Sequence, residues 1–187
     1  MINVREEPIV TVSIESTQKI TDEYLKGLRE TVNAEENPVE YLAIDPGKSN
    51  GICGYDAKLY MVFMLTISST DMVRCLHQFE KVQYCIVEDF KLYPNKARSQ
   101  SYSNMETSRV IGRIEAWAEL KDVKLIKQPA TIKETGYKWI GQKPLPKSDK
   151  KNHQVDAHVH FMYWVIKSGR FDASNLVHGL TRDPDAS

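Results

Sequence analysis

The stretch YLAIDPGKSNGICGYD, Tyr41 to Asp56, decides the fold. It opens with a short apolar run that ends at Asp45 and is followed by a Pro-Gly turn signal, which predicts a buried strand. The apolar segment 52–55 predicts a second strand that forms a hairpin with the first. Asp45 thus ends a buried strand, where a carboxylate is costly unless it is paired, hydrogen-bonded or bound to a metal. The plain alternative is an aspartate that caps a turn.

The tripeptide Gly47-Lys48-Ser49 matches the end of a P-loop motif, which places a first glycine five residues before the second. Leu42 occupies that position. Without the first glycine the loop lacks the tight turn that cradles a phosphate, so this stretch does not predict a P-loop.

Length and composition predict one domain of ordinary size. The chain has 187 residues, of which 41% are hydrophobic and 27% are charged, which is typical of a globular protein. No apolar run is long enough for a membrane span, and no secretory signal is visible at the N-terminus. Cys53, Cys75 and Cys85 lie in or beside apolar runs without a CxxC pair. We therefore expect reduced thiols in a cytoplasmic protein, and no zinc site.

The net charge of zero hides an asymmetry along the chain. Residues 1–40 contain four basic and nine acidic residues, whereas residues 90–151 contain fourteen basic and six acidic residues. A locally basic surface on a neutral protein favours contact with a polyanion. The alternative is a lysine-rich surface that is only solvated.

The pattern of apolar residues predicts an α/β domain with a mixed sheet. Residues 84–87 form a continuous apolar run, which is typical of a strand covered on both faces. We expect strands at 8–14, 41–44, 52–55, 59–67, 84–87 and 123–126, and helices at 22–33, 71–79, 105–120, 130–140 (broken at Gly136) and 152–167. Thr21 is expected to cap the first helix.

Polar residues gather at three of these elements. Glu88 ends the strand 84–87, as Asp45 ends its own strand, and His153, Asp156 and His160 share one face of the last helix because they are spaced i, i+3 and i+7. That helix needs an apolar face to pack on the sheet, so an aspartate beside it indicates a functional site. Carboxylates with an imidazole suit Mg²⁺ or Mn²⁺, and two such ions can together promote phosphodiester hydrolysis.

Four segments resemble the RuvC-type Holliday-junction resolvases of the ribonuclease H-like superfamily. They are AIDPG (Ala43–Gly47), CIVEDF (Cys85–Phe90), KLIKQPATIKETG (Lys124–Gly136) and HQVDA (His153–Ala157). The resemblance covers roughly 39–169. It implies a mixed five-stranded sheet flanked by helices, preceded here by an extra strand and helix. The expected division is an N-terminal extension 1–38, a nuclease domain 39–170 and a tail 171–187.

The resemblance also implies roles for individual residues. Asp45, Glu88 and Asp156 match metal-binding carboxylates, and His153 matches a histidine that many members place before the last acid. We expect two Mg²⁺ ions per active site, with Mn²⁺ as a possible substitute. His160 falls outside the pattern and is a secondary candidate ligand. Asp89 should face away from Asp45, because adjacent strand residues point to opposite faces.

A resolvase of this kind is expected to cut branched DNA as a homodimer, since two symmetric nicks need two active sites. An aromatic residue after Glu88 contacts bases in the family, and either Phe90 or Tyr93 could serve here. The cations expected to contact phosphates are Lys91, Lys96, Arg98, Arg109, Arg113, Lys133, Lys138, Lys150 and Lys151.

Two other readings stay open at the level of sequence. A ribonuclease H-like nuclease for flaps or RNA–DNA hybrids would have the same metal site. A non-catalytic nucleic-acid scaffold or a nucleotide-binding protein is the third hypothesis, since the turn after Asp45 is also similar to the phosphate loop of sugar kinases and actin-like proteins. The chain is short for that two-domain fold.

Overall fold

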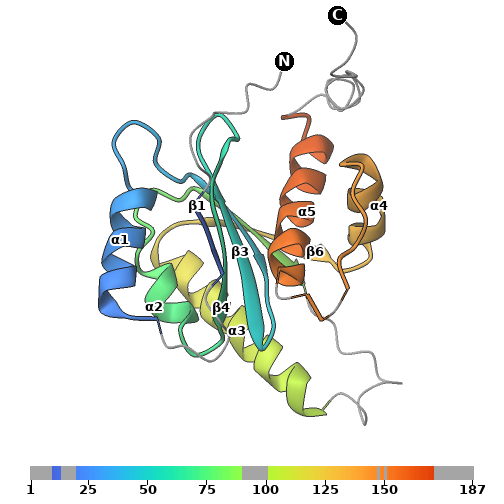
Figure 1. Ribbon diagram of the computed structural model, residues 1–187, viewed down its shortest axis with the longest axis horizontal. Helices are drawn as coiled ribbons and strands as arrows, with labels where there is room; N and C mark the ends of the chain where they lie inside the picture. The colour runs from blue at the N-terminus through green and yellow to red at the C-terminus, as the bar shows by residue number, and fades with distance from the viewer. Residues whose placement is uncertain (1–9, 14–19, 90–100, 147, 150, 171–187) are drawn as a thin grey trace, which may run out of the picture.

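The computed structural model describes residues 10–13, 20–89, 101–146, 148–149 and 151–170 (Figure 1). Within them, six strands form one sheet in the order β1-β4-β3-β2-β5-β6. The strands are β1 (Val10–Ser13), β2 (Tyr41–Asp45), β3 (Ser49–Tyr55), β4 (Met61–Ser68), β5 (Tyr84–Asp89) and β6 (Lys124–Pro129). The helices are α1 (Asp22–Val32), α2 (Met72–Leu76), α3 (Ser101–Leu120), α4 (Ile132–Trp139) and α5 (Asn152–Lys167).

The predicted mixed five-stranded sheet is confirmed as β4-β3-β2-β5-β6. Strands β2, β3 and β4 are antiparallel neighbours, whereas β5 and β6 run parallel to β2. The expected N-terminal strand joins the same sheet as a sixth strand, parallel to β4. Because β2 and β5 are parallel, with Ile44 opposite Val87, their C-terminal ends meet at one edge. Asp45 and Glu88 are the residues that follow that pair.

Helices cover both faces of the sheet, α1, α2 and α3 on one side and α4 and α5 on the other (Figure 1). Leu42 and Ile44 of β2 belong to the larger core, which also contains apolar residues of α1, α2 and α3. Tyr41 and Ala43 belong to the core beneath α5. This alternation directs Asp45 toward α5, since successive strand residues point to opposite faces.

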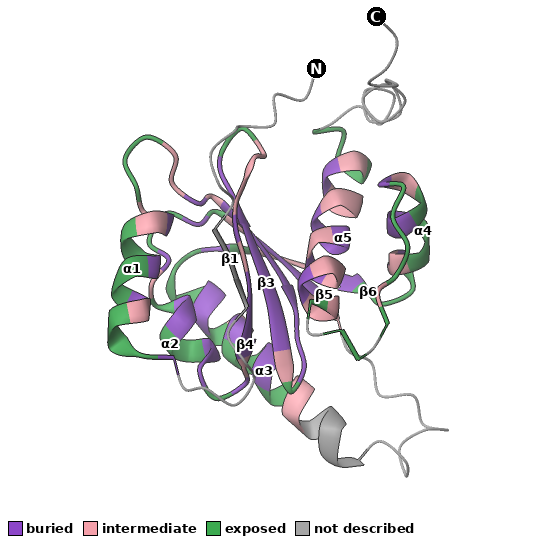
Figure 2. Ribbon diagram, viewed as in Figure 1, coloured by how far each residue is buried: buried purple, intermediate pink, exposed green. Residues whose placement is uncertain are grey.

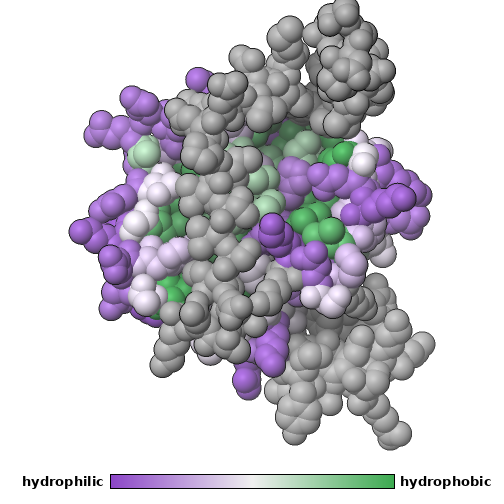
Figure 3. All heavy atoms as spheres, in the orientation of Figure 1, coloured by the Kyte–Doolittle hydropathy of each residue, from purple (hydrophilic) through white to green (hydrophobic). Residues whose placement is uncertain are grey.

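Strands β2 and β3 are buried along almost their whole length, whereas only Gln128 of β6 is buried (Figure 2). Hydrophilic side chains occupy both margins of the molecule in the same view, where α1 and α4 lie (Figure 3). The three cysteines are buried and free. Among the described helices, none has the length and apolar character that crossing a membrane requires.

Helix α4 is continuous through Gly136, so the predicted break at that residue is wrong. The glycine has a packing reason instead. A Cβ atom there would lie 2.6 Å from Val159 Cγ1 of α5 and 3.3 Å from the Val159 carbonyl oxygen. A residue without a side chain thus lets α4 approach α5 closely, which carries the first turn of α4 toward the acidic end of the sheet.

Gly51 of β3 fixes the position of the first turn of α5. A Cβ atom at Gly51 would lie 1.9 Å from the backbone oxygen of His153 and 2.5 Å from the backbone nitrogen of Gln154. We expect Gly51→Ala to lower the free energy of unfolding by about 2 kcal/mol or more, because α5 must shift. Urea unfolding measures this change. Gly112→Ala is the control, since nothing lies within 4 Å of its added Cβ, and a small gain in stability is expected there. Equal effects of the two substitutions would contradict the close contact.

Tyr55 of β3 and His158 of α5 form a polar pair between the sheet and the helix, with the Tyr55 hydroxyl 2.8 Å from Nδ1 of the imidazole. Burial lowers the pKa of His158 to about 4. The unfolded chain, with a histidine pKa of about 6.5, therefore binds this proton more readily than the folded protein does. Stability should accordingly be lost as the pH falls from about 6.5 toward 4.

His158→Gln should remove that part of the pH dependence, because an amide can accept the tyrosine hydrogen bond without titrating. Between pH 7 and pH 4 the wild-type protein should lose on the order of 2–3 kcal/mol more stability than the variant. Urea unfolding at several pH values measures the difference, and the exposed His77 offers the control His77→Gln. Parallel curves for wild type and His158→Gln would show that His158 is protonated as easily when folded as when unfolded.

Candidate metal centre

Three carboxylates from three different elements converge at the C-terminal ends of β2 and β5. Asp45 ends β2, Glu88 lies near the end of β5 and Asp156 lies in the second turn of α5. All three carboxylates form an ion pair with the ammonium group of Lys133. Its Nζ lies 2.9 Å from Asp45, 2.5 Å from Glu88 and 2.7 Å from Asp156. The three acids named from the sequence are therefore brought together around one cation position.

Alternation along the strands explains which acids take part. Ile86 of β5 belongs to the core beneath α5, whereas Cys85 and Val87 belong to the opposite core. Glu88 accordingly faces α5, beside Asp45, and Asp89 is the next residue along the strand. On α5, Ala157 and Phe161 pack on the sheet, and Asp156 lies beside that apolar stripe.

The pKa values of the two strand carboxylates, Asp45 and Glu88, are shifted in opposite directions. Burial raises the pKa of Asp45, whose side chain is only 6% exposed, although His153 and Lys133 act in the other direction. Burial also acts to raise the pKa of Glu88, but the hydrogen bond from His160 and the charge of Lys133 outweigh it, and the pKa falls to about 2. Neighbouring carboxylates disfavour ionising together. A positive charge between them is what the arrangement requires.

Lys133, from the first turn of α4, supplies that charge in the metal-free protein. Burial acts to lower the pKa of its ammonium group, but the three carboxylates raise it well above the usual value, so Lys133 stays protonated. The sequence predicts that this lysine is one of the exposed cations that contact phosphates. The structure instead places its ammonium group inside the acidic cluster, with 22% of the side chain exposed.

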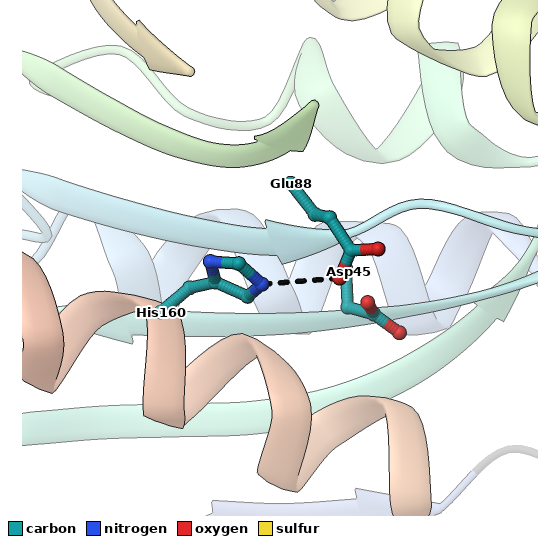
Figure 4. Close-up of side chains that lie close together, drawn as sticks. All are labelled: Asp45, Glu88 and His160. Atoms are coloured by element: carbon teal, nitrogen blue, oxygen red, sulfur yellow. Dashed lines mark hydrogen bonds and ion pairs between the residues drawn. The ribbon is translucent and has the colours of Figure 1, made fainter. Parts of the chain in front are cut away.

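The two histidines named from the sequence both reach the cluster, in different ways. His153 lies at the margin, with 42% of its side chain exposed and Nδ1 2.5 Å from an Asp45 carboxylate oxygen. That hydrogen bond raises the pKa of His153 despite partial burial. His160 is fully buried, and its Nε2 lies 3.0 Å from Glu88 Oε2 (Figure 4).

His160, the secondary candidate, belongs to a group of side chains in the described part of the chain that could hold a metal ion. One ligand atom each of Asp45, Glu88 and His160 all lie within 4.8 Å of one another (Figure 4). Two carboxylates and an imidazole fit a divalent cation of the Mg²⁺ or Mn²⁺ kind, which takes mainly oxygen ligands. The ammonium group that Lys133 places here shows that the cluster accepts a cation.

Two residues that contact the acids and histidines were not assigned to the metal centre from the sequence. Tyr137 donates its hydroxyl proton to Asp156 Oδ1 over 2.6 Å, and it lies one turn after Lys133 on α4, a spacing that could have linked the two. Gln128 of β6 is buried, stands opposite Glu88 in the sheet and has its Oε1 2.8 Å from Nδ1 of His160. A neutral amide in a short strand gives no signal of this role.

The cations expected to contact DNA are only partly described. Arg109 and Lys151 are exposed, as is Lys138, which pairs with Glu134 on the same helix. Arg113 donates a hydrogen bond to the backbone oxygen of Ser69. Phe90, Lys91, Tyr93, Lys96, Arg98 and Lys150 lie outside the described residues.

The mixed sheet, with its helices on both faces, is a ribonuclease H-like α/β fold, and the structure resembles Holliday-junction resolvases at low sequence identity. The likeness is to Thermus thermophilus RuvC in complex with a Holliday junction substrate, with a TM-score of 0.50, 13% identity, and coverage of 70% of this chain and 94% of that one. Yeast mitochondrial resolvase Ydc2 gives a TM-score of 0.42 at 12% identity, covering 85% of this chain and 93% of its own. No family model and no curated protein sequence matches the chain.

Proposed function

We propose that the protein is a metal-dependent endonuclease that resolves four-way or other branched DNA junctions. The observation that carries the proposal is the convergence of Asp45, Glu88 and Asp156 on one cation position, at the edge of a ribonuclease H-like sheet. The similar fold of a RuvC structure that holds a Holliday junction substrate supports this choice of substrate. Paired nicks across a junction need two active sites, so the proposal includes a homodimer.

The partners of Asp45 lie on its two different carboxylate oxygens, an arrangement that suits two ions. One Asp45 oxygen faces Lys133 and the other faces His153, so this carboxylate would be the one to hold a cation on each side. Glu88 and His160 lie together on one side, and Tyr137 holds Asp156 on α5. Two bound Mg²⁺ or Mn²⁺ ions would stabilise the attacking and leaving oxygens of a phosphodiester during hydrolysis.

The proposal includes DNA binding by the basic segment 90–151 and a cytoplasmic location. The exposed cations Arg109, Lys138 and Lys151 are available to bind DNA phosphates, which would make affinity fall with rising salt. Three buried free cysteines agree with a cytoplasmic location, where thiols stay reduced.

The test compares end-labelled substrates: a four-way junction, a flap, an RNA–DNA hybrid and a linear duplex, each with Mg²⁺, with Mn²⁺ and with a chelator. We expect metal-dependent paired nicks in the junction and little cleavage of the duplex. Preferred cleavage of the flap or the hybrid would assign the chain to the alternative nuclease class. Junction binding without cleavage under every condition would favour the scaffold hypothesis, in which Lys133 permanently neutralises the acids.

A further inference from the structure

We propose that His160 is a metal ligand through Nε2, that Gln128 holds its ring in the tautomer this requires, and that the centre therefore prefers Mn²⁺ to Mg²⁺. This inference deepens the proposed function and rests on the metal centre described above. It concerns two residues, one outside the family motif and one with no role assigned from the sequence.

The imidazole of His160 lies between two oxygen atoms. Its Nδ1 is 2.8 Å from Gln128 Oε1, and its Nε2 is 3.0 Å from Glu88 Oε2. Both oxygens accept hydrogen bonds, but a neutral imidazole carries only one N–H. With the amide oxygen of Gln128 toward the ring, satisfying both contacts needs an additional positive species, either a second proton on the ring or a metal ion between nitrogen and carboxylate.

Gln128 decides which nitrogen keeps the proton. Its side chain is buried, and it stands directly opposite Glu88 on the neighbouring strand, so both side chains rise from the same face of the sheet. When the amide oxygen accepts the Nδ1 proton, Nε2 is left with its lone pair directed at Glu88. Outer partners commonly fix metal-binding histidines in this way, and their loss typically weakens metal affinity by about 10–100-fold.

The spacing of the two ligand atoms fits a shared ion. Nε2 and Oε2 are 3.0 Å apart. Two atoms bound at about 2.1 Å to one metal, at right angles to each other, are separated by about 3.0 Å. A metal ion between Nε2 and Oε2 would satisfy both groups, in place of the hydrogen bond that joins them in the structure. Asp45 is within reach of the same ion, because the three ligand atoms lie within 4.8 Å of one another.

The nitrogen ligand sets the ion preference. Carboxylate oxygens alone suit Mg²⁺, whereas imidazole moves selectivity toward transition metals. The cluster keeps two carboxylates beside one buried imidazole, so it stays a mainly oxygen site. Mn²⁺ is the ion that accepts both ligand types while keeping the geometry of Mg²⁺ sites, and we expect at least about tenfold tighter binding of Mn²⁺.

Pulsed electron paramagnetic resonance of Mn²⁺ bound to the full-length protein tests the ligand. With ¹⁵N-labelled histidine, the wild-type spectrum should show coupling to an imidazole nitrogen, and the coupling should persist in His153→Gln. These two samples do not depend on whether a His160 variant folds. Absence of nitrogen coupling in both, with Mn²⁺ bound, would overturn the proposal. Coupling that disappears in His153→Gln would assign the nitrogen to His153 and would overturn it as well.

Metal titrations test the role of Gln128. Gln128→Leu should weaken Mn²⁺ binding by about 10–100-fold and shrink the Mn²⁺ over Mg²⁺ preference, whereas Gln128→Glu, which also accepts from Nδ1, should keep it. The exposed His77 provides the control His77→Gln. Unchanged Mn²⁺ affinity in a folded Gln128→Leu protein would overturn the positioning role. Junction cleavage without His160 ligation would refute only this inference, and His160 ligation without cleavage would refute only the proposed function.

Discussion

Asp45→Asn is expected to abolish cleavage of a four-way junction while leaving junction binding close to that of the wild-type protein. Asp45 lies at the centre of the acidic cluster, where one carboxylate oxygen faces Lys133 and the other faces His153. An asparagine offers one oxygen and no charge, so it cannot bridge two cations. We expect the cleavage rate to fall on the order of 10²–10³-fold or more, as when one preorganised electrostatic group is lost.

Single-turnover cleavage and gel-shift affinity, measured on the same junction, check this expectation. Asp56→Asn is the matched control, because Asp56 is also buried and follows the next strand. Its Oδ1 accepts hydrogen bonds from the backbone nitrogens of Lys58 and Tyr60, an arrangement that asparagine can keep. The control should cleave at nearly the wild-type rate. Full activity of Asp45→Asn would remove Asp45 from the site.

Lys133→Met should lower the stability of the protein without metal and raise its affinity for a divalent metal ion. Without a metal, the ammonium group is shared by Asp45, Glu88 and Asp156, and its removal leaves three largely buried carboxylates without a counter-charge. Breaking a buried ion pair in this way costs about 3–5 kcal/mol. A divalent cation restores the charge, and it no longer has to displace an ammonium group. The variant should therefore bind Mg²⁺ and Mn²⁺ more tightly than the wild-type protein.

Unfolding by urea, with a chelator and with a series of metal concentrations, separates the two effects. The chelated variant should be less stable than wild type, and added metal should stabilise it by the larger amount, since a tighter ligand stabilises more at equal concentration. Lys138→Met, on the same helix and exposed beside Glu134, is the control and should change little. Equal metal responses in wild type and Lys133→Met would mean that the lysine and the ion occupy different places.

The sequence was most informative where a strand or helix repeat alone determined the position of a site residue. Asp45 and Glu88 could be placed together because each ends an apolar strand run, and alternation along the strands separates Glu88 from Asp89. Asp156 and His160 followed from helical spacing, and the structure brings both to the cluster. The local pattern supplied these positions, and the family resemblance supplied the choice of Glu88 over Asp89 and the metal-binding roles of the acids.

The role of Lys133 could not be read in this way, because it depends on how a short helix docks. Helix α4 approaches α5 where Gly136 meets Val159, and that contact between distant segments delivers Lys133 and Tyr137 to the acids. In the sequence the same lysine is one of many cations in a basic segment. Gln128 is similar, since its contact with His160 depends on strand register and helix position together.

The sixth strand, β1, determines where the chain can be shortened without loss of folding. β1 pairs with β4, and α1 contributes Leu25, Leu28 and Val32 to the main core. A chain shortened to begin at residue 39 would lose both. It would leave the backbone hydrogen-bonding groups along one side of β4 without their strand partner, and unprotected sheet edges of that kind recruit strands from other molecules. Such a shortened chain should aggregate during expression even though every acid of the metal centre is present.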